Sequence, residues 1–406
     1  MNCIKTLIIT FAIIAVPAGV RAQDNAAAAI VAPEGAVSVA VDTLTCDSVA
    51  AQPKERKGFF GKFIDYFDKS NDVDESKRFD ISFIGGPHYS NDTGFGLGAV
   101  ASLHYRPDMT DTVTPRSIVS FAADATTKAH FMLKAEGYHI FRDDKSRLIY
   151  ELGFRYLQDK YWGIGYDACS NDDNETKYHY MTLEANAAYI FRLGRSMFVG
   201  PMVSFDYYMS RDVKRPDLYP YLEDNVVRWG PGVSLQLDTR DNLTAPKRGA
   251  YVRLDFRYMP KFIGNAEGMT VTELTAAGYF GVWRDCTMAV GGHTRLTTGL
   301  VPFNMMSTVG GSHFMRGYFD GRYRDRNEVD VCVELRQRVW RRSGLVVWGG
   351  MGVIFDKFSN IDFGHLLPNY GLGYRWEFKH NVNIRLDVGF GRNGERNFIF
   401  NINEAF

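Results

Sequence analysis

The sequence predicts an all-β protein, a 16-stranded antiparallel transmembrane β-barrel with a short N-terminal periplasmic segment. Three observations lead to this expectation. The chain of 406 residues begins with a secretion signal. Apolar and polar side chains alternate through residues 78–406, and the connections between the alternating stretches are by turns short and long. A barrel that crosses an outer membrane has these properties.

Residues 1–22 have the features of a signal peptide that is cleaved on export. Lys5 supplies the positive charge, an apolar run extends from Leu7 to Val16, and Val20-Arg21-Ala22 offers a cleavage site. The alternative is a membrane anchor, but the run is shorter than the roughly 20 apolar residues of a transmembrane helix. No other stretch is long and apolar enough, which argues against a helical membrane protein.

Two further segments precede the alternating region. Residues 23–57 are rich in Ala, Val, Asp and Ser and are expected to form a disordered periplasmic spacer. Residues 58–77 are expected to form an amphipathic helical segment, whose apolar face consists of Phe59, Phe60, Phe63, Ile64 and Phe67. This segment either lies at the membrane interface or packs on the protein itself, and amphipathicity alone does not distinguish the two.

The alternation has the period of a β-strand. The clearest example is the apolar row Val382, Ile384, Leu386, Val388 and Phe390, whose intervening residues are polar or glycine. Successive side chains of a strand point to opposite faces, so one face is apolar and the other polar. A soluble β-sandwich also alternates, but the stretches here reach the roughly ten residues that a tilted strand needs to cross a bilayer, and globular strands are usually nearer five or six.

About 16 strands are expected, and an even number suits a single-chain barrel. Their positions are 79–88, 94–105, 116–126, 129–141, 146–157, 177–192, 196–208, 227–238, 248–259, 269–282, 286–299, 327–339, 344–355, 368–379, 381–391 and 396–406. With the N-terminus in the periplasm, the short connections are periplasmic and the long ones extracellular. The connection at 106–115 is longer than this rule predicts.

Composition excludes some functions. The 47 basic and 47 acidic residues balance, which argues against nucleic acid as a partner because phosphate binding needs a basic excess. The 29 Phe and 22 Tyr suit a lipid-facing surface with aromatic girdles. Outer-membrane lipid is therefore the first expected partner. The cysteines show no CxxC pair or zinc pattern and are interpreted as scattered thiols, although an exported compartment permits a disulfide.

No catalytic or metal site is predicted, and no cofactor is expected. Ser312 is not part of a GxSxG elbow, and His130 and His139 lack the spacing of a catalytic triad. A barrel phospholipase remains an alternative. The acidic run at 171–175 offers oxygen ligands for Ca²⁺ but lacks the EF-hand pattern, so a solvated outer loop is favoured.

The last predicted strand carries apolar residues in alternation. They are Phe398, Phe400, Ile402 and Phe406. This pattern resembles the C-terminal signal of bacterial outer-membrane proteins. Since a barrel cannot leave an open strand edge in lipid, this strand is expected to pair with the first one.

Two internal motifs resemble the BamA/TamA superfamily, also called the bacterial surface antigen family. The first joins strands eight and nine and comprises Asp238, Arg240, Asp241, Asn242, Arg248 and Gly249. The second is Arg316-Gly317-Tyr318, in the long loop after strand eleven, with Met315 in place of the usual aliphatic residue. The resemblance covers residues 79–406.

The resemblance implies that the loop folds into the lumen and that Arg316 meets acidic residues of the wall. Glu334 matches the family's acidic residue on strand twelve, and alternation places it on the inner face. A second acid of the family is replaced by Gly350, so the arrangement must be weaker or different here. The alternative is that Arg316 is an ordinary solvated loop arginine.

The resemblance also implies a function at the bacterial outer membrane: insertion or translocation of client polypeptides. The family's periplasmic POTRA domains are not expected to fit in the about 55 residues between the signal peptide and the first strand. A POTRA-bearing or other periplasmic partner is therefore expected. The alternative function is a passive pore, a receptor or an adhesin-like surface barrel.

Overall fold

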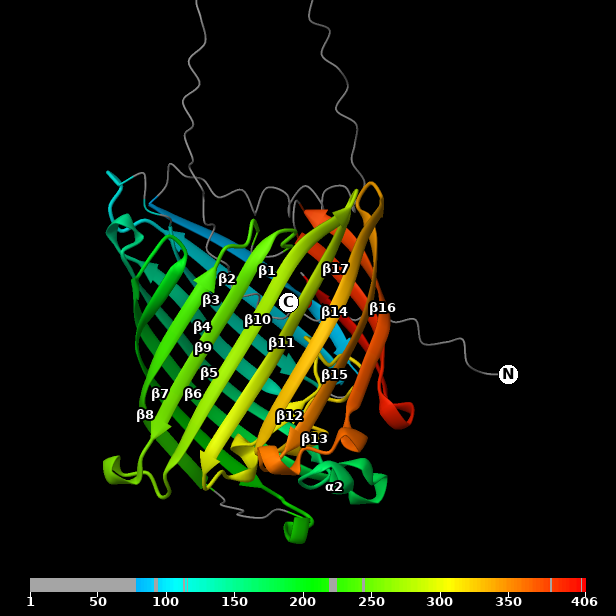
Figure 1. Cartoon of the computed structure of the whole chain (residues 1–406). Helices are drawn as coiled ribbons and strands as arrows, with labels where there is room; N and C mark the ends of the chain where they lie inside the picture. Colours follow the sequence, from blue (N-terminus) through cyan, green and yellow to red (C-terminus); the bar gives the residue numbers. More distant parts are fainter. Residues whose placement is uncertain are drawn as a thin grey trace, which may run out of the picture.

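The computed structural model describes residues 78–90, 94–111, 114, 116–218, 225–242, 245–379, 382–402 and 404–406. The predictions for residues 1–22, 23–57 and 58–77 lie outside the described residues. Sixteen antiparallel strands form one sheet that curls into a barrel (Figure 1). The predicted fold class is therefore confirmed.

The strands follow one another in chain order around the barrel, each paired with its neighbours. Their bounds are β1 Phe79–Ser90, β2 Gly94–Tyr105, β3 Ser117–Thr126, β4 Phe131–Ile140, β5 Ser146–Tyr161, β6 Thr176–Arg192, β7 Met197–Arg211, β8 Asn225–Asp238, β9 Gly249–Met259, β10 Met269–Trp283, β11 Cys286–Gly299, β14 Asn327–Trp340, β15 Ser343–Phe355, β16 Leu367–Lys379, β17 Val382–Phe390 and β18 Arg396–Ile402. Each predicted strand has a counterpart within a few residues.

Helical structure is confined to the connections. The one α-helix of the described residues is α2, Tyr166–Ser170. The 3-10 turns are η1 Arg142–Asp144, η2 Asp172–Asn174, η3 Pro216–Leu218, η4 Lys261–Ile263, η5 Phe303–Met305, η6 Phe358–Asn360, η7 Phe363–His365 and η8 Arg392–Gly394. Among the described residues, no helix has both the length and the apolar character needed to cross a membrane.

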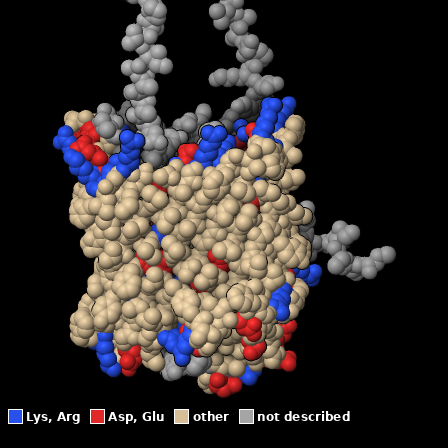
Figure 2. Space-filling view, in the orientation of Figure 1, with Lys and Arg blue, Asp and Glu red and all other residues tan. Residues whose placement is uncertain are grey.

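The period-two pattern separates two faces of the wall. On β14, Val331 and Val333 are exposed on the outside, whereas Asp330 and Glu334 are buried inside. Figure 2 shows the result on one face of the barrel, where charged side chains gather toward the two ends and a mostly uncharged belt lies between them. The outer face thus matches a hydrocarbon layer, and the polar side chains line the lumen.

One expectation about the wall needs correction. The strand predicted over 396–406 ends at Ile402, and the last described residues leave the ladder. The long connection at 106–115 is partly accounted for by a neighbouring turn, since the backbone N–H of Asp143 donates to the Thr114 hydroxyl at 2.8 Å. A turn that supports its neighbour in this way need not be short.

The loop at residues 300–326 contains structure that the sequence did not predict. Two short strands, β12 Ser307–Val309 and β13 Tyr323–Asp325, form a separate two-stranded sheet. Together with α2 they lie toward one end of the barrel (Figure 1). We call residues 300–326 the lumen loop, because their apolar side chains pack in buried clusters with residues of the wall.

Candidate functional site

The lumen loop is held against the inner face of β14–β17 by apolar packing. Its buried residues Val309, Phe314, Met315, Tyr318 and Tyr323 form a cluster with wall residues. Those wall residues are Cys332, Val346, Trp348, Ile354 and Leu367. The cluster excludes water around the one arginine of the loop motif, which raises the strength of its electrostatic contacts.

Arg316 lies at the centre of this cluster and contacts two carboxylates of the wall. Its Nη2 is 2.5 Å from Glu334 Oε1 on β14, and its Nη1 is 2.8 Å from Asp387 Oδ2 on β17. All three side chains are 0% exposed. The guanidinium carbon also lies 3.8 Å from the ring centroid of Trp348. Burial disfavours the charged guanidinium, but the two carboxylates outweigh it and raise the pKa of Arg316 above its ordinary value.

Further charges connect these carboxylates to the rest of the wall. Arg336 Nε is 2.8 Å from Glu334 Oε2, and Arg375 Nη1 is 2.5 Å from Asp387 Oδ1. Arg375 Nε is also 2.7 Å from Glu404 Oε2. We call this set the Arg316 cluster; its members are Arg316, Arg336, Arg375, Glu334, Asp387 and Glu404. Each carboxylate meets at least two arginines, and Asp387 also has Arg385 Nε at 3.7 Å. The network therefore ties the loop to β14, β16 and β17 at once.

The two residues after Arg316 fix the loop backbone. The N–H of Gly317 donates to Asn369 Oδ1 at 2.8 Å, and a Cβ at Gly317 would lie 2.4 Å from the Phe390 carbonyl carbon. The Tyr318 hydroxyl donates to the Pro368 carbonyl at 2.6 Å and accepts from the Arg392 N–H at 2.8 Å. Burial raises the pKa of the Tyr318 hydroxyl well above its ordinary value, so it remains a neutral donor.

The residues that follow β18 turn toward the lumen loop. The Phe406 ring lies 4.6 Å from that of Phe314, and His313 Nδ1 is 2.9 Å from the Ala405 carbonyl. Of the predicted C-terminal strand signal, Phe398 faces outward, while Phe400 and Ile402 lie in β18. Phe406 does not continue their row, because Glu404 pairs with Arg375 and draws the segment inward.

A cap lies over one end of the lumen. It forms where α2 and the connections that carry His365 and Glu395 meet the lumen loop. The Arg322 guanidinium pairs with Asp172 at 2.6 Å and also with Glu395. The rings of Tyr166 and His365 stack at 4.1 Å. Cys169 of α2 is buried within this cap, and burial raises the pKa of its thiol to about 11. Three connections that are far apart in sequence therefore converge on the loop.

The turn motif between β8 and β9 is held mainly by its own residues. Arg240 and Asp238 form a two-pronged pair, with Nη2–Oδ2 at 2.7 Å and Nε–Oδ1 at 2.9 Å. The Asp241 carboxylate accepts from the backbone N–H groups of Lys247 and Arg248, at 2.9 and 3.2 Å. Asn242 Oδ1 accepts from the Ala245 N–H at 2.9 Å. Gly249 has φ +99°, and a Cβ there would lie 2.1 Å from the Thr239 carbonyl oxygen.

The sequence reasoning missed part of the Arg316 cluster. Gly350 indeed offers no acid, and the second carboxylate comes from Asp387 on β17. Asn369, Arg375 and Glu404 were also missed. The alternation of β17 places Asp387 on the polar face of that strand, but this signal does not indicate which polar residue of the wall meets a loop residue far away in the chain.

The chain resembles known proteins both in sequence and in structure. The Omp85 superfamily domain matches residues 135–406. None of the curated protein sequences matches this chain. A BamA from Haemophilus ducreyi lacking POTRA domains 1–3 is similar in structure, with TM-score 0.56 and 11% identity over 80% of this chain and 69% of that one.

Two CdiB structures are more distant. That from Acinetobacter baumannii has TM-score 0.48 and 13% identity, and covers 78% of this chain and 57% of its own. That from Escherichia coli has TM-score 0.49 and 10% identity, and covers 80% and 60%. The BamA likeness supports the barrel fold, and the domain match covers more than half of the sequence. This chain belongs to the Omp85 superfamily, the group of BamA/TamA-type outer-membrane barrels.

Proposed function

We propose that this barrel assists the insertion or translocation of polypeptides at the outer membrane, with a periplasmic partner that delivers the clients. The observation that carries the proposal is the lumen loop, pinned by the buried Arg316 cluster to β14, β16 and β17. A lumen closed by packed side chains is unsuited to free solute flow. The transport route of such a barrel is therefore its wall rather than its centre.

The strand lengths support a route between the first and last strands. Among the described residues, β1 and β18 are the two end strands of the ladder, and β18 has 7 residues whereas β6 has 17. A short strand contributes fewer ladder hydrogen bonds than a long one, so its pairing is easier to exchange. An edge exposed in this way pairs with an incoming client strand by β-augmentation. The Arg316 cluster, beside β18 through Glu404, would hold one state of this seam.

Site-specific photo-crosslinking tests where clients meet the barrel. A photoreactive phenylalanine analogue replaces Phe398 on β18 or, as a matched control, Phe256 on β9, two outward-facing residues that are 57% and 41% exposed. Clients are expected to crosslink at Phe398 and not at Phe256. Equal crosslinking at both positions, or none at Phe398 in cells with active export, would contradict the seam.

Depletion of the protein in its own host tests the broader function. A fall in many folded outer-membrane proteins is expected, with rescue by wild type and by Arg284→Ala, since that turn arginine is 96% exposed. Arg316→Ala is expected not to rescue fully. If the other barrels are unaffected by depletion, a dedicated transporter, a pore, a receptor or an adhesin takes the place of general insertion.

Conductance separates the passive pore from the proposed function. The purified protein in a planar bilayer is expected to be closed or to flicker, because the lumen loop and the cap fill one end of the barrel. A steady open pore with ion selectivity would favour the channel alternative.

A further inference from the structure

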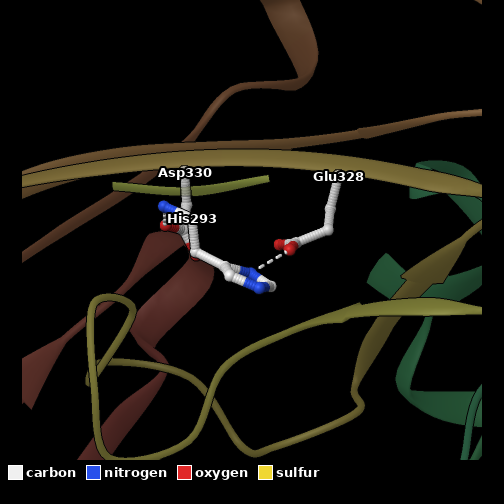
Figure 3. Close-up of side chains that lie close together, drawn as sticks. All are labelled: His293, Glu328 and Asp330. Atoms are coloured by element: carbon white, nitrogen blue, oxygen red, sulfur yellow. Dashed lines mark hydrogen bonds and ion pairs between the residues drawn. The ribbon is translucent and has the colours of Figure 1, made fainter. Parts of the chain in front are cut away.

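The lumen wall carries a second cluster of ionisable side chains, apart from the Arg316 cluster. It consists of His293 on β11 and of Glu328 and Asp330 on β14 (Figure 3). The two strands are paired so that His293 lies opposite Asp330. His293 Nδ1 is 2.5 Å from Glu328 Oε1, and the His293 backbone N–H donates to Asp330 Oδ1 at 2.9 Å. One ligand atom from each residue lies within 4.8 Å of the others.

A third carboxylate borders the cluster but has other partners. Glu273 Oε1 on β10 is 3.3 Å from His293 Nε2. Its Oε2 atom meets Arg257 at 2.8 Å and Arg295 at 3.3 Å. Two arginines therefore balance Glu273. Within the described part of the chain, the ion pair of Glu328 is with His293 alone.

Glu328 has a buried oxygen that no protein group satisfies. Its side chain is 1% exposed, and Oε2 has no hydrogen-bond partner among the described residues. Figure 3 shows the carboxylate directed toward the His293 ring. Burying a carboxylate oxygen without a partner is costly, so its position next to an imidazole and another acid indicates a bound cation.

We propose that His293, Glu328 and Asp330 bind a divalent transition-metal ion such as Zn²⁺. One imidazole nitrogen and carboxylate oxygens are ligands that Zn²⁺ accepts at about 2.0–2.2 Å. Two carboxylates balance the charge of the ion, and water takes the open coordination position. Ligand atoms 4.8 Å apart or closer need only small side-chain rotations to reach such bond lengths. Mg²⁺ is a poor candidate because it prefers an all-oxygen octahedral shell.

The position of the site gives the ion a structural consequence. β11 and β14 are the two strands between which the lumen loop leaves and re-enters the wall. Arg295, two residues after His293, donates to the Met305 carbonyl inside that loop at 3.2 Å. A metal ion held between His293 and Glu328 therefore ties together the two ends of the loop. This inference does not depend on the proposed function.

Zinc binding to the untagged protein in detergent micelles tests the proposal, with isothermal calorimetry after treatment with a chelator. Wild type is expected to bind one Zn²⁺ per chain and to bind Mg²⁺ much more weakly. Glu328→Gln and His293→Gln are expected to weaken Zn²⁺ binding at least about tenfold, because each removes a direct ligand and even the loss of a group that only orients a ligand costs about 10–100-fold. The matched control is His179→Gln, which alters another histidine–carboxylate pair, with Asp212 at 3.2 Å, and is expected to leave binding unchanged.

Two site variants are used in case one of them fails to fold. The shift of the folded barrel on an unheated gel reports folding, and Glu328→Gln keeps the size of the side chain if His293→Gln fails to fold. Co²⁺ adds a second readout, since its visible absorption should appear in wild type and disappear in Glu328→Gln. Zinc binding that is absent from wild type, or equal in wild type and a folded Glu328→Gln variant, would overturn the proposal.

Discussion

The two arginine motifs of this barrel form the same kind of ion pair, but with partners at very different distances along the sequence. Arg240 pairs with Asp238, two residues away, within one turn. Arg316 pairs with Asp387, which lies 71 residues further along the chain, inside the lumen. The first pair is partly exposed, and the second is wholly buried. The contrast indicates that one arginine shapes a local turn, whereas the other depends on wall residues of β14, β15 and β17.

Removal of Arg316 should cause the largest loss of barrel stability. Arg316→Ala leaves Glu334 and Asp387 buried without their shared cation, and losing one partner of a buried pair costs about 3–5 kcal/mol. A lower urea midpoint of the refolded barrel in micelles should report the loss. Arg316→Lys keeps the charge but not the two-pronged geometry, so its loss should be smaller. An unchanged midpoint for Arg316→Ala would show that the loop arginine is not held by the wall.

A backbone substitution tests whether the lumen loop must approach the wall so closely. Gly317→Ala places a Cβ 2.4 Å from the Phe390 carbonyl carbon, and such overpacking costs about 1–3 kcal/mol. The matched control is Gly153→Ala on β5, where a Cβ would meet nothing within 4 Å. Urea midpoints should fall for the first variant alone. Equal midpoints for both would mean that the loop can move away without loss.

A pH titration sharpens the comparison, because the lumen motif has a histidine three residues before Arg316 and the turn motif from Asp238 to Gly249 contains none. The side chain is partly exposed, but the protein atoms around it desolvate the imidazole and lower the pKa of His313 below its ordinary value of 6.5. The unfolded chain then binds the proton more tightly, so the free energy of unfolding is lost as pH falls from about 6.5 toward the folded pKa. His313→Gln should flatten this loss, measured as urea midpoints at pH 8 and pH 5.5. If the urea midpoint of the variant falls between pH 8 and pH 5.5 as much as that of wild type, a group other than His313 causes the loss.

The smallest effect is expected at the turn. Arg240→Ala removes a pair whose side chains are 16% and 29% exposed and a stack on the Tyr251 ring at 4.3 Å. Partly exposed pairs contribute about 0.2–1 kcal/mol. The urea midpoint should therefore shift far less than in Arg316→Ala. A loss as large as that of Arg316→Ala would remove the distinction between the two motifs.

The strands could be predicted well because their information is local. The alternation in Val331, Glu334 and their neighbours assigns both the strand and its faces, since one residue of slip would move every apolar side chain into the lumen. The turn motif is local too. Asp241 caps backbone groups six and seven residues on, a distance at which sequence spacing is informative.

The interior could be predicted only in part because its contacts join distant residues. The resemblance pointed from Arg316 to Glu334, but nothing near Asp387 or Glu404 marks them as members of the same cluster. The pair β12–β13 was missed for another reason: three-residue strands are too short to show a period. His293 and Glu328 are ordinary residues of two strands until the pairing of β11 with β14 brings them together.

The chain order of the Arg316 cluster also sets a sequence of events in folding. Arg316 precedes Glu334, Arg375, Asp387 and Glu404, so the lumen contacts cannot form until β14, β16 and β17 are in place. Contacts between residues far apart in the chain form slowly, because the loop-closure entropy comes first. Earlier in assembly the lumen loop has no wall to bind. Arg316 can therefore become buried only late in folding, after the last strands have paired in the correct register.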